Sequence, residues 1–394
     1  MPSIQSLQMT TRIRTAAQRA GTLGVFALAS ALAFVPAAQA ELQPMNVRIA
    51  ADLTGPPHPA GVAMEYIRAN LPKVIPGSKV QLYYAGALYR IPEAVEAMTA
   101  GDLEMTWGQF GKSAQIEPYM AIVNGPLLIT TPGAMNQLDK FETVTMLKER
   151  MLSGHGVRIL GTAHLSWYIG MGFKSRVDSP DDLKGLKVRS TGPAENAALG
   201  AWGANPQTMA FGDVPPALET GVIDGLVTSL GGFNVTKEQA PFFTVAGING
   251  VVGDYYWLGV SDQWLSKFNK ETQDAFTKFI VTDVIPFQKK MNFCNDLRML
   301  DKYGTKDPSK PGIYILKPDE AAGFQDLLGD ATTKWVKKNT PKPADPWVDR
   351  FIEEAKAAVA AHPLGSDPLE QTNCEEMNPY FTKYGKWVRP KKKK

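Results

Sequence analysis

Residues 182–229 read DLKGLKVRSTGPAENAALGAWGANPQTMAFGDVPPALETGVIDGLVTS, and this stretch decides the fold. A strand-like run ends at Arg189, directly before a Ser-Thr-Gly-Pro turn. The residues that follow predict a helix over AENAALGAWG, a strand over PQTMAF, a proline-started helix over VPPALETG and a strand over VIDGLVTS. Strands that alternate with helices in this way indicate a parallel sheet with crossover helices.

The same alternation occurs nearer the N-terminus. Period-two and period-3.6 patterns predict, in order, a strand over 45–52, a helix over 61–74, a strand over 79–86, a helix over 91–101 and a strand over 103–109. The chain therefore contains two β-α-β-α-β layouts, one before and one after residue 166. A chain of this length is long for one core and suits two lobes.

Between and beyond these layouts lie the segments that should connect the lobes. They are a helix over 138–152, one or two strands over 156–173, a strand over 254–261, and a long amphipathic stretch over 262–304 that bends at Pro286 if it is one helix. We expect the chain to cross between the lobes near Trp167 and near Gly253. The resulting divisions are 41–166 plus 254–295 for the first lobe, 167–253 plus 296–340 for the second, and 341–394 for a C-terminal helix and basic tail.

Residues 1–40 have the pattern of a secretory signal peptide. They contain three arginines and no acid, then the apolar run GVFALASALAF and the small-residue end AAQA. Cleavage is expected after Ala40. The alternative is a membrane anchor, but the apolar run is shorter than the roughly 20 residues that span a bilayer. The sequence therefore predicts an exported protein.

Charge and cysteine usage exclude several classes of function. Without the three basic residues of the leader and the five among the last six residues, 34 basic residues face 39 acidic ones. This slightly acidic body does not fit a nucleic-acid-binding protein. Cys294 and Cys374 either form a disulfide that pins the tail to the body or stay as two buried thiols. The four histidines are scattered and predict no metal site.

The sequence also lacks the common catalytic motifs. It contains no GxSxG elbow, P-loop, HExxH or GxGxxG. A binding protein is therefore expected rather than an enzyme, with no catalytic residue and no cofactor. Arg189 is the leading binding residue, because the crevice outside parallel strand ends is where α/β sheets bind ligands and a guanidinium fits a carboxylate with two parallel hydrogen bonds. The alternative for Arg189 is a structural salt bridge.

The motifs of this stretch resemble the solute-binding proteins of TRAP transporters, the DctP family. DLKGLKVR, then GANPQTMAFGDV, then ALETGVIDG stand in the family's order, and AVEAMTAGDLEMTWGQ ahead of them is similar to its N-terminal part. The similarity covers about residues 45–300. It implies an α/β fold of the two-lobed periplasmic binding protein type, with an interlobe cleft and a long bent helix that spans both domains.

The resemblance also implies which residues bind the ligand. Arg189 matches the arginine that binds the ligand carboxylate. Cleft-facing positions that match less firmly are Phe211, Thr228, Gln109 and Asp52. Sialic-acid-type relatives have a second arginine before the signature, whereas this chain reads SWYIGMGFKS there, which argues against a dicarboxylate. Trp167 and Tyr168 then predict an apolar or aromatic wall unless they belong to the core, and Arg90 is a candidate second charge from the other lobe.

The implied function is capture of a small organic monocarboxylate in the periplasm. The solute would pass to a membrane permease with a small and a large integral subunit, driven by an ion gradient, and the binding protein would need no metal. Two alternatives remain open at this point. One is a periplasmic enzyme on the same fold, and the other is a ligand-sensing module that docks on a receptor.

Overall fold

The computed structural model describes residues 41–246 and 255–381, which belong to one compact unit. The predicted signal peptide, the predicted crossing near Gly253 and the lysine tail lie outside the described residues. Within the described part of the chain, no helix has the length and apolar character needed to cross a membrane.

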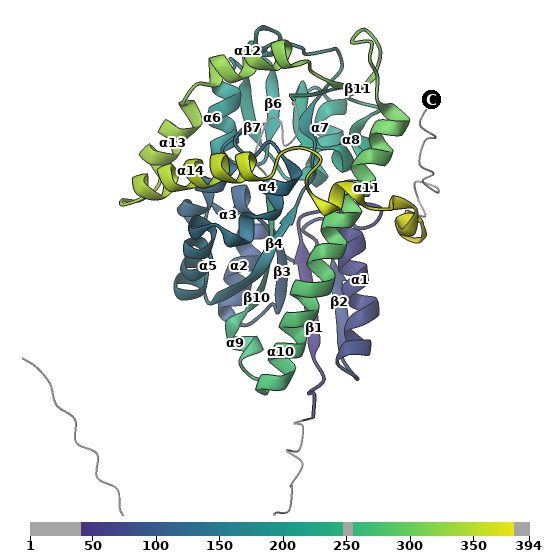
Figure 1. Ribbon diagram of the computed structural model, residues 1–394, viewed down its shortest axis with the longest axis vertical. Helices are drawn as coiled ribbons and strands as arrows, with labels where there is room; N and C mark the ends of the chain where they lie inside the picture. Colours follow the sequence, from purple (N-terminus) through teal and green to yellow (C-terminus); the bar gives the residue numbers. More distant parts are fainter. Residues whose placement is uncertain (1–40, 247–254, 382–394) are drawn as a thin grey trace, which may run out of the picture. The chain divides into compact units, whose positions relative to one another are not determined.

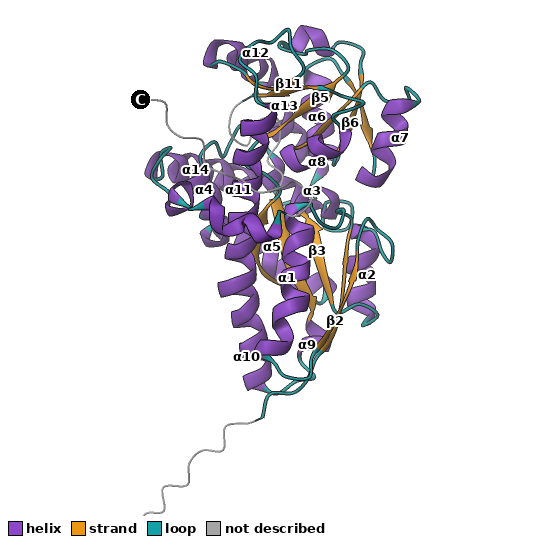
Figure 2. Ribbon diagram, turned by 90° about the vertical axis from the view of Figure 1, so that its right-hand side faces the viewer, coloured by secondary structure: helices purple, strands orange, loops and turns teal. Residues whose placement is uncertain are grey.

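The first sheet is built mainly from the N-terminal β-α-β-α-β layout. Its strands are β1 (Asn46–Ala51), β2 (Lys79–Tyr83), β3 (Met105–Gln109), β4 (Val157–His164) and β10 (Tyr255–Ser261), in the order β2-β1-β3-β10-β4. As predicted, β1 runs parallel to both β2 and β3, whereas β10 is antiparallel to β3 and β4. Helices α1 (Pro59–Val74) and α2 (Ile91–Ala100) make the crossovers and lie on opposite sides of this sheet (Figure 2).

The second sheet contains the stretch that predicted the fold. Its strands are β5 (Ile169–Phe173), β6 (Lys187–Ser190), β7 (Asn205–Thr208), β8 (Gly225–Ser229), β9 (Phe242–Val245) and β11 (Gly312–Ile315), in the order β11-β9-β5-β8-β6-β7. Strand β6 is parallel to β7 and β8, through α6 (Pro193–Ala201) and α7 (Val214–Glu219), and this confirms the predicted local order. Strand β5 is antiparallel to β8 and β9.

The chain passes from the first sheet to the second between His164 and Ile169. Strand β4 pairs with β10 in the first sheet, and β5, which follows after four intervening residues, pairs with β8 and β9 in the second. The segment 156–173 is therefore two strands in two different sheets. Strands β9 and β10 also belong to different sheets, so a return passage lies between them. We use "first lobe" and "second lobe" for the elements packed on each sheet; the lobe boundaries given above stay a prediction.

A long helical stretch contacts elements of both sheets (Figure 1). It consists of α10 (Lys270–Lys278), a π-helical turn (Phe279–Val284) and α11 (Ile285–Tyr303). A proline ring clashes with the carbonyl four residues before it, so a wider turn directly ahead of Pro286 makes room for the ring. Helix α11 contacts α1 and β4 of the first lobe, and α8 (Leu230–Thr236) and β11 of the second.

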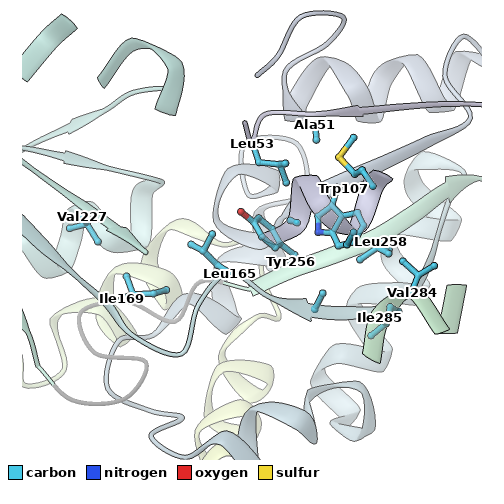
Figure 3. Packing of buried hydrophobic residues seen from close by; sticks show 14 of the residues in the cluster. Ala51, Leu53, Trp107, Leu165, Ile169, Val227, Tyr256, Leu258, Val284 and Ile285 are labelled. Atoms are coloured by element: carbon cyan, nitrogen blue, oxygen red, sulfur yellow. The ribbon is translucent and has the colours of Figure 1, made fainter. Parts of the chain in front are cut away.

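One hydrophobic cluster is shared by the two sheets. Figure 3 shows Trp107 and Leu258 of the first sheet in the same cluster as Ile169 and Val227 of the second, with Leu165 of the crossing segment between them. All of these side chains are buried. Apolar packing therefore continues from one lobe to the other beneath the site described below.

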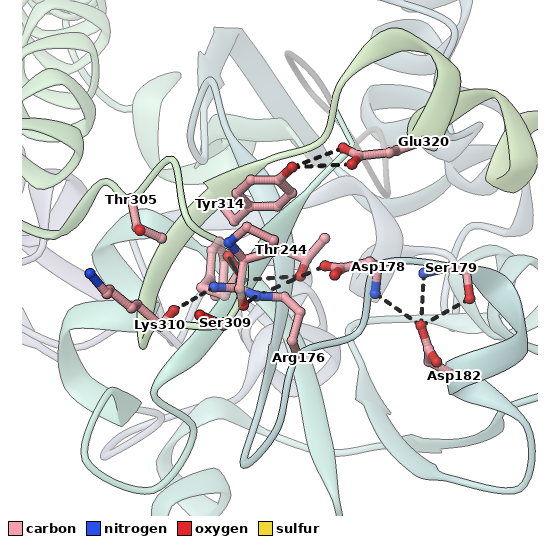
Figure 4. A network of polar contacts seen from close by, with 12 residues as sticks. Arg176, Asp178, Ser179, Asp182, Thr244, Thr305, Ser309, Lys310, Tyr314 and Glu320 are labelled. Carbon is pink, nitrogen blue, oxygen red and sulfur yellow. Dashed lines mark hydrogen bonds and ion pairs between the residues drawn. The ribbon is translucent and has the colours of Figure 1, made fainter.

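Arg176 fixes the loop that follows α11 onto the second sheet (Figure 4). Its Nε donates to the carbonyl of Pro308 at 3.0 Å, one terminal nitrogen donates to the carbonyl of Phe243 at 2.9 Å, and the other donates to that of Lys310 at 2.9 Å. The guanidinium also lies 5.3 Å from the ring centroid of Tyr314. This loop leads into the edge strand β11, so Arg176 holds that edge in register.

The C-terminal part of the chain packs back onto the body. Cys294 of α11 and Cys374 form a disulfide, which decides between the two alternatives left by the sequence. Helix α14 (Asp345–Ala361) packs on α4 (Pro132–Asn136) and α5 (Glu142–His155). The remaining α-helices of the described residues are α3 (Phe110–Ser113), α9 (Asp262–Leu265), α12 (Pro318–Leu328) and α13 (Ala331–Asn339).

Candidate ligand-binding cavity

A cavity lies where strand ends of the two sheets face each other. Such a crevice is the expected binding place in open α/β sheets. Its lining residues from the first lobe and the crossing segment are Asp52, Leu53, Thr54, His58, Ile91, Trp107, Gln109, Lys112, Leu165 and Tyr256. Those from the second lobe are Arg189, Thr191, Phe211, Thr228, Ser229 and Gly232.

Arg189 is the central charged residue of the second lobe in this cavity. It pairs in register with Leu226 of β8, so it stands near the end of an interior strand. Its side chain donates from Nε to the carbonyl of Met209 at 3.0 Å and from Nη1 to that of Val227 at 2.9 Å. Only 2% of the residue is exposed. Because two carbonyls fix the plane of the guanidinium, the group is oriented before any ligand arrives.

Phe211 and Thr191 stand beside Arg189. The Phe211 ring centroid lies 5.8 Å from the guanidinium carbon. Thr191 is held by Glu195, whose Oε2 accepts from the Thr191 amide at 2.7 Å and from its hydroxyl at 2.5 Å. Burial raises the pKa of Glu195, and these two hydrogen bonds and the charge of Arg189 oppose that rise. The wall around Arg189 is thus built from the turn before α6, which Glu195 of α6 supports, and from the short helical turn Phe211–Asp213 after β7.

The first lobe contributes a buried ion pair that sequence reasoning found only in part. Lys112 Nζ lies 2.7 Å from Asp52 Oδ2, and each side chain is 9% exposed. Asp52 follows β1 directly, and Lys112 lies in α3, three residues after the end of β3. Sequence reasoning did not identify Lys112, although the signal resembles the one that identified Arg189. Each is a charged residue at the end of a buried strand or within a few residues after it.

His58 supplies a neutral polar group to the lining. It is the N-cap of α1, and its Nδ1 accepts from the amide of Ala60 at 3.3 Å. Burial lowers the pKa of His58 to about 4, so the ring is neutral at neutral pH. Because Nδ1 accepts a hydrogen bond, the ring proton is on Nε2, and His58 is a hydrogen-bond donor at that atom.

Five of the residues predicted from the sequence line the cavity together: Arg189, Phe211, Thr228, Gln109 and Asp52. Three predicted residues do not line it: Trp167, Tyr168 and Arg90. Residues that sequence reasoning did not identify include His58, Trp107, Lys112, Leu165, Thr191 and Tyr256.

The three residues outside the lining have other neighbours. Trp167 is buried in the crossing segment, with its ring centroid 4.8 Å from that of Phe293. Tyr168 packs against the same cluster, and burial raises the pKa of its hydroxyl to about 12. Arg90 lies 3.5 Å from Asp213 of the other lobe, and both side chains are about half exposed. This exposed pair bridges the lobes and contributes at most about 1 kcal/mol.

The described residues contain no group of three or more His, Cys, Asp or Glu side chains that could hold a metal ion. The lining of the cavity consists of three charged groups, several neutral donors and acceptors, and apolar and aromatic side chains. A small anion with an apolar or hydroxylated body matches such a lining.

Comparison with known protein families identifies the family of this chain. The sequence profile of the bacterial extracellular solute-binding proteins, family 7 (DctP), matches residues 53–335. The chain belongs to this family. The match confirms the resemblance to the solute-binding proteins of TRAP transporters that the sequence motifs predicted.

This family 7 solute-binding protein is similar to curated relatives over most of its length. It is 24% identical over 275 residues to the 2,3-diketo-L-gulonate-binding periplasmic protein YiaO of Escherichia coli, covering 68% of this chain and 79% of that protein. It is 24% identical over 344 residues to the C4-dicarboxylate-binding periplasmic protein DctP of Rhodobacter capsulatus, covering 86% of this chain and 97% of that protein.

Solved structures confirm the predicted two-lobed α/β fold. The sugar acid binding protein DctPAm of Advenella mimigardefordensis, in complex with galactonate, superposes with a TM-score of 0.71 at 19% identity, covering 81% of this chain and 100% of that one. A TRAP periplasmic solute-binding protein of Sulfurospirillum deleyianum with bound succinate gives 0.69 at 21% identity, covering 80% and 100%. At these identities the likeness is one of fold.

Proposed function

We propose that this solute-binding protein captures a small organic acid in the periplasm and delivers it to the membrane permease of a TRAP transporter, without chemical change to the solute. The observation that carries the proposal is the placement of Arg189, buried and oriented by two carbonyls, in the cavity between the lobes. The relatives bind such solutes: succinate is bound in one solved structure and galactonate in another.

We further propose that the solute carries one negative charge. Arg189 and Lys112 are the positive groups of the lining, Asp52 is the negative one, and His58 is neutral. The lining therefore has a net charge of about one positive unit, which a monocarboxylate neutralises. A second carboxylate in the same cavity would be left without a compensating charge from this lining, and an uncompensated buried charge is unfavourable.

The test is to titrate the purified protein with monocarboxylates and with succinate by calorimetry, and to repeat the titrations with Arg189→Lys and Arg189→Ala. Truncation of one partner of a buried charged hydrogen bond costs about 2 to 5 kcal/mol, so Arg189→Ala should lose at least about tens-fold in affinity. Lysine keeps the charge but loses the planar fork, so an intermediate loss is expected.

Arg48→Lys is the matched control, because Arg48 donates to both oxygens of Glu104 and does not line the cavity. Its melting temperature reports what an arginine-to-lysine exchange does to folding alone. Undiminished binding of every acid by Arg189→Ala would refute the carboxylate role of Arg189, and tighter binding of succinate than of all monocarboxylates would refute the single-charge proposal.

A further inference from the structure

A buried carboxylate oxygen in the cavity has no hydrogen-bond partner. Asp52 Oδ2 is bonded to Lys112 Nζ at 2.7 Å, but Asp52 Oδ1 is buried and, among the described residues, meets no donor. An unsatisfied buried acceptor is unfavourable, the more so on an ionised group. In a protein whose task is to bind a solute, such an oxygen next to the binding cavity marks the place for a donor on the solute.

The position of Asp52 is fixed by the backbone on either side of it. The carbonyl of Ala51 accepts from the amide of Gly86 at 3.0 Å, and the carbonyl of Leu53 accepts from the amide of Ala85 at 2.8 Å. The main chain on either side of Asp52 is therefore fixed by two backbone hydrogen bonds, and the carboxylate itself is bonded to Lys112 through Oδ2. A binding side chain that is supported by a neighbouring charge and a fixed main chain is the arrangement expected of a selective site.

The ion pair also lies where two hollows meet. Asp52, Lys112 and Thr191 line both the cavity with Arg189 and an adjoining pocket that includes Arg90 and Thr208. A solute whose carboxylate is bound by Arg189 therefore has room to extend past Asp52. The part of such a solute that lies near Asp52 would contact the unpaired Oδ1.

Only certain groups can satisfy this oxygen. A carboxylate is an acceptor without a proton to donate, so the second carboxylate of a diacid would face Asp52 acceptor to acceptor and charge to charge. A ligand ammonium would be repelled by Lys112 and Arg189. A hydroxyl donates one hydrogen bond, adds no charge, and its own lone pairs can accept from a neighbouring donor.

We propose that the solute is a hydroxylated monocarboxylic acid whose hydroxyl donates to Asp52 Oδ1, and that Asp52 is the residue that selects it. Lys112 is a positioning residue, since it holds the carboxylate through Oδ2. This inference rests on the proposed capture of an organic acid by Arg189, and it narrows the class of acid.

The test measures dissociation constants for matched acids that differ by one hydroxyl: lactate and propanoate, 3-hydroxybutanoate and butanoate, and 4-hydroxybutanoate and butanoate. For the wild-type protein we expect at least one hydroxy acid to bind about tenfold to a hundredfold more tightly than its deoxy partner, because the deoxy acid leaves Asp52 Oδ1 unpaired. The ratio of the two constants is the readout, and a change in folding alone does not alter it.

Two variants separate selection from structure. The double variant Asp52→Leu with Lys112→Met removes both charges together and leaves neither partner alone in the interior. In this double variant, the ratio of the dissociation constants of the deoxy acid and the hydroxy acid should fall to about one. Asp52→Asn keeps an oxygen acceptor but loses the charge, so an intermediate ratio is expected. The matched control, Arg48→Met with Glu104→Leu, removes an ion pair that does not line the cavity and should keep the wild-type ratio.

The outcomes distinguish this inference from the proposed function. Equal binding of hydroxy and deoxy acids by the wild type, or an unchanged ratio in the double variant, would overturn the role of Asp52 while binding that depends on Arg189 still stands. If no acid binds, or binding is indifferent to Arg189→Ala, both proposals fail together. The wild type should bind succinate more weakly than the preferred hydroxy acid, and Asp52→Asn should reduce this difference. Both results would support repulsion between Asp52 and a second carboxylate of the solute.

Discussion

Gly192 of the second lobe lies against the backbone of Gly111 of the first, and a Cβ atom on Gly192 would stand 2.8 Å from the Gly111 carbonyl oxygen. Gly192 directly precedes α6, and Gly111 lies in α3. Backbone segments of the two lobes therefore touch at a point where neither carries a side chain. The lobes can approach this closely only because residue 192 is glycine.

Gly192→Ala should therefore hinder closure of the two lobes. The Cβ would meet a backbone oxygen, which cannot move aside as a flexible side chain does. The backbone at residue 192 is extended, with φ of −174°, so alanine itself fits the local conformation. We expect the affinity for the solute to fall about tenfold or more, as for a site that can no longer close fully around its ligand. Titration calorimetry measures this loss.

Gly200→Ala, in the helix that follows Gly192, is the control. A Cβ at residue 200 would meet nothing within 4 Å, and alanine is favoured over glycine inside a helix by about 0.5 to 1 kcal/mol. We expect this variant to bind as the wild type does and to melt at an equal or higher temperature. Equal affinities of the two glycine variants would show that the contact at Gly111 does not limit closure.

The fold could be predicted from the sequence because its signals are local. Proline at the start of α6 and α7, glycine after α2, and period-two strands each specify an element from its own residues. The antiparallel strands β5 and β10 could not be ordered in this way, since their partners lie far away in the chain. The π-helical turn before Pro286 has a local cause, but its form depends on packing against α1.

Binding residues could be predicted from the sequence only where a charged or polar residue stands at the end of a strand. Arg189, Asp52 and Gln109 stand at or next to such ends and line the cavity. Trp167 and Tyr168 stand close to a strand as well, but the chain changes sheets there and they face the cluster around the disulfide. Which direction a side chain takes at such a crossing depends on the tertiary packing, which one sequence does not specify.

Asp296 makes stability depend on pH at the crossing between the sheets. Its Oδ2 accepts from the hydroxyl of Ser166 at 2.6 Å and from the amide of Trp167 at 2.7 Å, and the residue is 1% exposed. Burial raises the pKa of Asp296 to about 7, although these hydrogen bonds oppose the rise. Between about pH 4 and pH 7 the folded protein thus keeps a proton that the unfolded chain has released. Stability from this group is complete at low pH and is lost as the pH rises through about 7.

Asp296→Asn should remove this dependence while keeping an oxygen that accepts both hydrogen bonds. We expect the free energy of unfolding of the wild type, relative to the variant, to fall by on the order of 3 to 5 kcal/mol between pH 4 and pH 8. His58 and His164 act in the opposite sense, because burial lowers the pKa of each, so only the difference between the two proteins isolates Asp296. Urea denaturation at a series of pH values measures it. A constant difference across this range would contradict the prediction; Asp326→Asn, at an exposed position, is the control for an aspartate-to-asparagine exchange.

The disulfide between Cys294 and Cys374 joins α11 to the last described segment over a sequence separation of 80 residues. Met377 and Phe381 beyond it are buried with Trp167 and Phe293, beside the crossing between the sheets. Closing a loop of this length restricts the unfolded chain, and loss of a native disulfide typically costs about 2 to 5 kcal/mol.

The double variant Cys294→Ala with Cys374→Ala should therefore unfold at a lower urea concentration, with a free energy of unfolding lower by about 2 to 5 kcal/mol. Addition of a reducing agent should shift the wild-type midpoint in the same direction and leave the double variant unchanged. Because the apolar contacts of Met377 and Phe381 remain, solute affinity should change far less than stability. Equal midpoints of the wild type and the double variant under oxidising conditions would show that these contacts alone hold the C-terminal segment on the body.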